Sequence, residues 1–217
     1  YIDKKEIEIE IELIRDEKVN NLEIEKSEEN KIYDDDLYDL IDQADLLYLD
    51  GKLKESIAFI EAQIKKYPNI PEFYQVLALS NWRLKNFEKQ ILFAQKVIEL
   101  ENDSELSLNA YNLLGIGYSL KQGGEQQSIF YYKKCIDKKS DEHSFYRNRA
   151  ISYIGLELLP NLPIKIRNNY KLKADEDLRK IIEISKTTKK IDYQLLHSEA
   201  LAHNLLGNPK LALGLLN

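Results

Sequence analysis

The chain has 217 residues, of which 43% are hydrophobic and 31% charged, with a formal net charge of −6. This composition excludes a chain that is disordered throughout, because it is sufficient to bury a core as one domain or as a stack of small units. Eight Gly and five Pro are few, and this scarcity of breakers predicts an all-α protein of helices joined by short turns.

The first 36 residues form a separate acidic segment. They hold 14 acidic and 6 basic residues, a charge of −8, so the remaining 23 acidic and 25 basic residues carry +2. The sequence EIEIEIEL, from Glu6 to Leu13, alternates with the period of a strand and predicts a strand or hairpin. The charge density favours a mostly disordered leader equally well, and a helix with Ile7 and Ile11 on one face is a third reading.

From residue 37 to 217 the sequence repeats, which predicts a second domain built of helix pairs. A small residue in one amphipathic stretch is followed by a small or polar residue in the next, at separations of 12, 12, 13, 24 and 12 residues. The pairs are Ala44 and Ser56, Ala78 and Gln90, Gly115 and Ser128, Ala150 and Ala174, and Ala200 and Ala212. Short side chains at such places let two antiparallel helices approach closely. The separation of 24 indicates about twelve residues inserted in one turn, and we expect a long irregular excursion between Ile154 and Tyr170.

This pattern resembles the tetratricopeptide-repeat family, whose unit is a 34-residue helix-turn-helix. The step from Ala44 to Ala78 is 34 residues, and the best copy of the unit is NAYNLLGIGYSLKQGGEQQSIFYYKKCIDKKS. The matching residues in this copy are Tyr111, Leu114, Gly115, Tyr118, Ser128, Tyr132 and Cys135. Pro68, between the first two units, stands where the family has its unit-ending proline. The resemblance covers about four and a half units and implies a right-handed superhelical solenoid of antiparallel helix pairs. Gln90 departs from it, since the family expects Ala there.

The sequence offers little catalytic chemistry. Its histidines, His143, His197 and His203, are too scattered for a metal cluster. Cys135 lies on an apolar helical face and is expected to be a buried structural thiol. We therefore predict no catalytic, cofactor-binding or metal-binding residues, and a protein that is not an enzyme.

One stretch, PIKIRNNYKLK from Pro163 to Lys173, is locally basic. We expect a solvated loop there rather than a phosphate-binding patch, and so predict no nucleic-acid binding. The same stretch could contact an acidic partner or the acidic segment of its own chain. No apolar run in the sequence approaches the length of a membrane span. The cytoplasm is the default location, with membrane association as the alternative if an anchor preceded Tyr1.

By the resemblance, the first helices line the concave surface of the solenoid, where such proteins bind partners. Amides can hold a peptide main chain, Trp and Tyr supply anchoring area, and Arg can bind a carboxylate. The candidate partner-binding residues are Tyr38, Tyr48, Gln75, Trp82, Asn109, Asn112, Arg147, His197 and Asn204. For Tyr48 and Trp82 the alternative is packing between neighbouring first helices.

These observations predict a non-enzymatic scaffold that binds an extended peptide or a partner helix in its concave groove. The partner is another protein or peptide, and no small-molecule substrate or cofactor is expected. The alternative is an inhibitor of the immunity type, or a peptide-sensing regulator, that uses the same groove.

Overall fold

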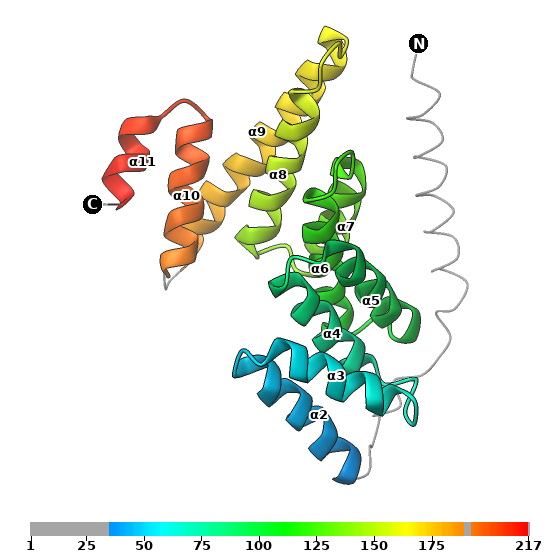
Figure 1. Cartoon of the computed structure of the whole chain (residues 1–217). Coiled ribbons are helices and arrows are strands. Elements are labelled where there is room, and N and C mark those ends of the chain that lie inside the picture. The colour runs from blue at the N-terminus through cyan, green and yellow to red at the C-terminus, as the bar shows by residue number, and fades with distance from the viewer. Residues whose placement is uncertain (1–34, 189–191, 217) are drawn as a thin grey trace.

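The computed structural model describes residues 35–188 and 192–216, and within these residues the chain forms ten helices and no strand (Figure 1). The helices pair into five units. The first helices are α2 (Asp35–Leu49), α4 (Pro71–Arg83), α6 (Glu105–Ser119), α8 (His143–Glu157) and α10 (Tyr193–Leu205). The second helices are α3 (Leu53–Ile64), α5 (Phe87–Leu100), α7 (Glu125–Lys138), α9 (Ile164–Thr187) and α11 (Pro209–Leu216). The alternating segment from Glu6 to Leu13 lies outside the described residues.

The pairs stack into an all-α solenoid, which confirms the predicted fold class. Each helix packs on the next along the chain, and successive first helices also contact one another: α2 with α4, α4 with α6, α6 with α8, and α8 with α10. Successive second helices in the described part of the chain share at most a marginal contact. Because a curved stack brings its elements closer together on the inner side, the first helices line the concave side.

Small residues let the two helices of a unit touch. Ala44 and Ser56 are fully buried, and the Ser56 hydroxyl donates to the Ala44 carbonyl at 3.2 Å. In the third unit Ser128 donates to the Gly115 carbonyl at 2.9 Å. A Cβ on Gly115 would lie 2.7 Å from the Tyr132 ring, so no larger residue fits without movement.

Gln90 is accommodated in the place where the family expects Ala. Its side chain is fully buried, and its Nε2 donates to the Leu113 carbonyl of the next unit at 2.7 Å. Gly117 of α6 leaves the necessary room, because a Cβ there would lie 3.3 Å from Gln90 Nε2 and 2.7 Å from Ile91. A bulky residue in one unit is thus compensated by a missing side chain in the next.

The expected irregular excursion between Ile154 and Tyr170 is wrong. α8 continues to Glu157 and α9 starts at Ile164, so that the turn between them has six residues, and the basic stretch predicted to be a loop is helical. Most of the inserted residues lengthen the two helices, above all α9, which has 24 residues. The extension is helical because its two halves pack together: the rings of Tyr153 and Tyr170 stack with centroids 6.4 Å apart.

Candidate partner-binding face

The candidate residues occupy equivalent positions in successive units. Each first helix has a small residue at its contact with the second helix: Ala44, Ala78, Gly115, Ala150 and Ala200. Residues six and three positions before it, and one and four positions after it, fall within an arc of about 80° at 100° per residue. We call the surface formed by these positions in α2, α4, α6, α8 and α10 the first-helix face.

All nine candidates fall on this face in three rows. Tyr38 and Asn109 lie six positions before the small residue, Gln75, Asn112, Arg147 and His197 three before it, and Tyr48, Trp82 and Asn204 four after it. None of the nine side chains is buried. The nine side chains therefore lie on one side of the stack, and each is at least partly exposed.

The two aromatic residues in the last row have different surroundings. The Arg83 guanidinium lies 5.1 Å from the centre of the Tyr48 ring and donates to the Tyr48 carbonyl at 2.9 Å. This contact joins α2 to α4, so Tyr48 takes part in packing between first helices. Trp82 keeps 38% of its surface exposed, which is large for an aromatic residue and suits an anchor.

A row of amides crosses the middle of the face. Gln75 and Asn112 are half-buried, and neither Gln75 Oε1 nor Asn112 Oδ1 has a hydrogen-bond partner among the described residues. A buried acceptor without a donor costs free energy, and native structures leave few of them. Both oxygens are enclosed by protein atoms, so a partner would reach them only if these side chains rotated.

The face changes its charge along the stack. At the N-terminal end, partial burial together with the nearby carboxylates of Asp42 and Glu72 raises the pKa of Asp45. Glu72 belongs to α4 and Asp45 to α2, so this acidic end spans two units. In the fourth unit Arg147 of α8 supplies a cation. The face is therefore acidic in its first two units and carries a positive charge in its fourth.

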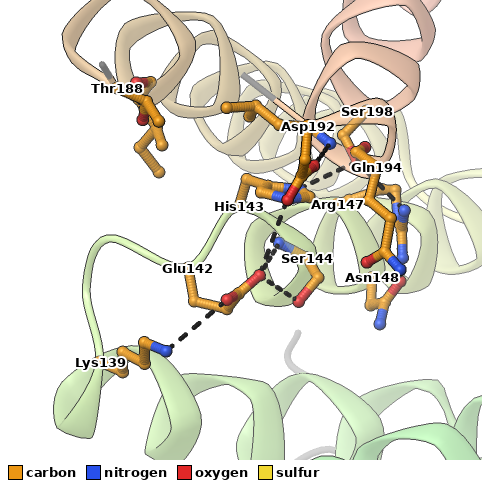
Figure 2. Close-up of polar contacts among 12 residues, drawn as sticks. Lys139, Glu142, His143, Ser144, Arg147, Asn148, Thr188, Asp192, Gln194 and Ser198 are labelled. Atoms are coloured by element: carbon orange, nitrogen blue, oxygen red, sulfur yellow. Dashed lines mark hydrogen bonds and ion pairs between the residues drawn. The ribbon is translucent and has the colours of Figure 1, made fainter. Parts of the chain in front are cut away.

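Arg147 is held by α10, as Figure 2 shows. Its Nη1 donates to Ser198 Oγ at 3.1 Å, and its Nε donates to Asn148 Oδ1 at 3.2 Å. His143 Nδ1 lies 3.0 Å from the same serine oxygen. Sequence reasoning missed this junction, because His143 and Ser198 are 55 residues apart and neither belongs to a motif.

The junction superficially has the parts of a catalytic triad, since Glu142 Oε1 lies 3.8 Å from His143 Nε2. Ser198, however, is fully buried and also donates to the Gln194 carbonyl at 2.9 Å. A nucleophile must reach its substrate, so this serine is a structural hydrogen-bonding group. Residues 35–188 and 192–216 contain no group of three or more His, Cys, Asp or Glu side chains that could hold a metal ion.

Burial lowers the pKa of His143, although Glu142 and Asp192 oppose the shift. At neutral pH the imidazole is therefore uncharged and hydrogen-bonded to Ser198. His197, the histidine expected on the face, is exposed, and its ring lies 6.3 Å from that of Tyr193. The two histidines serve different purposes: His143 joins two units, and His197 is accessible from outside.

No protein-family model and no curated protein sequence matches the chain. Solved structures do. MamA residues 41-end from Desulfovibrio magneticus RS-1 align with a TM-score of 0.62 at 13% identity, over 84% of this chain and 92% of that one. TTC0263, a thermophilic TPR protein in Thermus thermophilus, aligns with a TM-score of 0.57 at 15% identity, over 82% of this chain and 87% of that one.

YrrB, described as a TPR protein with an unusual peptide-binding site, aligns with a TM-score of 0.55 at 13% identity, over 82% of this chain and 81% of that one. At these identities the likeness concerns the path of the main chain and not the ligand. The repeat pattern and the structural likenesses together show that this chain has the tetratricopeptide-repeat fold.

Proposed function

We propose that this chain is a non-enzymatic interaction scaffold that binds an extended peptide or a partner helix along the first-helix face. The observation that carries the proposal is the alignment of nine accessible amide, aromatic, Arg and His side chains in three rows on one side of the stack. The structural neighbour with a described peptide-binding site supports the same use of this fold.

The spacing between neighbouring first helices suits an extended peptide. Packed helices lie about 8–10 Å apart, and an extended chain advances about 3.3 Å per residue. A bound peptide would therefore pass from one first helix to the next about every three residues. Gln75 and Asn112, once their side chains rotated, would bind its main chain, and Trp82 would take an apolar side chain. The acidic end beside Asp45 favours basic residues, and Arg147 favours a carboxylate, so the face gives the peptide a direction.

The proposal can be tested by selecting peptides from a random display library on the immobilised full-length chain and measuring their affinity by calorimetry. Replacing Trp82 with Ala should weaken a selected peptide by about 2 kcal/mol, the usual cost of losing an aromatic anchor. Asn112→Ala and Arg147→Ala should cause smaller losses. As the only Trp in the chain, Trp82 should also change its emission on binding.

Lys65→Glu is the matched control, because Lys65 is exposed at the end of a second helix, away from the first-helix face. It should leave affinity unchanged. The proposal fails if Lys65→Glu abolishes binding while Trp82→Ala, with its circular dichroism intact, binds as tightly as the parent chain.

A further inference from the structure

The α8–α9 hairpin projects from the solenoid. In each of the other four units the second helix begins three residues before its small or polar contact residue, whereas α9 begins ten residues before Ala174. Seven additional residues lengthen a helix by about 10 Å at 1.5 Å per residue. Figure 1 shows the turn of this hairpin reaching beyond the turns of the neighbouring helix pairs.

Large apolar side chains cover the end of this projection. Leu158 and Ile164 are 70% and 69% exposed, Leu172 is 53% exposed and Leu159 is 40% exposed. Single exposed apolar residues are ordinary on a protein surface, but several together mark an interaction site. The end of the hairpin is also a projection rather than a hollow, so it suits insertion into a partner better than reception of one.

The same end is strongly basic. No acidic residue occurs from 158 to 174, while Lys165, Arg167, Lys171 and Lys173 supply four positive charges. Helical spacing places Lys171, Ile164, Leu172 and Lys165 within an arc of about 120° on α9. Apolar and basic side chains are therefore interleaved on one face. We call the residues 158–173 the basic tip.

The basic tip is held in a fixed shape. Arg167 Nη2 donates to the Leu159 carbonyl across the turn at 3.3 Å. Lys173 Nζ lies 5.6 Å from the centre of the Tyr153 ring, which also stacks on Tyr170. These contacts join α8 to α9 up to the turn, so the exposed leucines are presented by a packed element.

We propose that the basic tip is a binding site for a lipid surface that carries anionic headgroups. Leu158 and Ile164 would enter the boundary between headgroups and acyl chains, and Lys165 and Lys171 would lie among the anionic headgroups. A nucleic acid would use the charges but not the apolar side chains. Residues 37–217 carry +2 in total, and the basic tip alone carries +4, so the rest of this part of the chain carries −2. An anionic surface would therefore attract the basic tip more strongly than the rest of the solenoid.

The test is co-sedimentation of the full-length chain with vesicles of phosphatidylcholine alone or mixed with phosphatidylserine. We expect the chain to bind only the mixed vesicles. Binding should weaken as the salt concentration rises, because salt ions screen the attraction between exposed positive charges and anionic headgroups. Lys165→Gln with Lys171→Gln should weaken binding about 25-fold, since each cation near such a surface contributes about fivefold. Leu158→Ser with Ile164→Ser should weaken it as well.

The matched control is Leu120→Ser with Lys121→Gln in the α6–α7 turn, where Leu120 is 54% exposed. It should bind vesicles like the parent chain, and so should Trp82→Ala, which separates this inference from the proposed function. The inference is overturned if anionic vesicles do not bind the chain in low salt, or if the serine variant binds as well as the parent. It is also overturned if anionic vesicles do not bind the chain and a peptide of residues 1–34 binds the basic tip instead.

Discussion

Removing Arg149 should destabilise the solenoid strongly, because this residue neutralises a buried carboxylate between α8 and α9. Arg149 Nε donates to Asp177 Oδ2 at 2.8 Å, and Nη2 donates to Oδ1 at 2.7 Å. The Asp177 side chain is only 6% exposed and that of Arg149 18%. Such a two-pronged pair satisfies both carboxylate oxygens in a place that water hardly reaches.

The expected cost of Arg149→Met is about 3 kcal/mol of unfolding free energy, the lower end of what a broken buried ion pair costs. We choose the lower end because Arg149 keeps some contact with solvent. Most of this cost comes from the carboxylate left behind rather than from the lost attraction. The double variant Arg149→Met with Asp177→Leu should therefore recover most of the stability, since an apolar pair needs no neutralisation.

The assay is urea unfolding followed by circular dichroism and, separately, by Trp82 emission. A solenoid is stabilised mainly by contacts between neighbouring units. Arg149→Met alters the fourth unit, so it should lower the midpoint seen by circular dichroism more than the midpoint seen by Trp82 in the second unit. Lys96→Met, which breaks the exposed Lys96–Glu99 pair, should cost at most about 0.5 kcal/mol.

The loss of unfolding free energy caused by Arg149→Met should also depend on pH. Burial already raises the pKa of Asp177, and Arg149 opposes the shift. Without Arg149 the pKa rises further above that of the unfolded chain, so the folded variant takes up a proton more readily. The loss of unfolding free energy in Arg149→Met, relative to the parent chain, is largest at neutral pH. It should become smaller as pH falls through the raised pKa of Asp177. A loss no larger than that of Lys96→Met, or a double variant no more stable than the single one, would refute this account.

Four further predictions concern buried groups. Ser128→Ala removes the hydroxyl that donates to the Gly115 carbonyl, and it should lower the free energy of unfolding in urea by about 1–2 kcal/mol. Gly115→Ala should lower it by about 1–3 kcal/mol, because the added Cβ would lie 2.7 Å from the Tyr132 ring. Burial lowers the pKa of His143, so the unfolded chain takes up that proton first. Stability should therefore fall as pH drops below about 6.5, and less steeply in His143→Asn, as urea midpoints against pH will show. Burial raises the pKa of Cys135 to about 12, so its thiol should react with a disulfide reagent only after unfolding, and rapid labelling of the native chain would contradict this.

The repeat could be predicted from the sequence because it depends on local chemistry. Small residues at Ala44, Ala78 and Gly115 mark the points where helices must approach, and they also fix the register of everything else on each first helix. Once the register is known, helical geometry determines which side chains share a face. For this reason the sequence alone is sufficient to place the nine candidate residues on one face.

The insertion in the fourth unit shows where that reasoning fails. The separation of 24 residues between Ala150 and Ala174 indicates inserted residues, but it does not determine whether they form a loop or lengthen the helices. The stretch after Pro163 nevertheless forms a helix because Tyr170 finds Tyr153 on α8 to pack against. A marginal helix is decided by such packing rather than by propensity, and the partner residue is not visible in the local sequence.

The sequence by itself thus determined the all-α repeat, the register of its helix pairs and the rows of the first-helix face, since each follows from spacing along one helix. Only the tertiary structure decided which groups from distant parts of the chain meet. The junction of His143 with Ser198, the Arg149–Asp177 pair and the projecting basic tip all depend on contacts between helices. The physical reason is that burial, which sets the pKa of a histidine and the cost of an unpaired charge, is a property of the packed stack rather than of any segment.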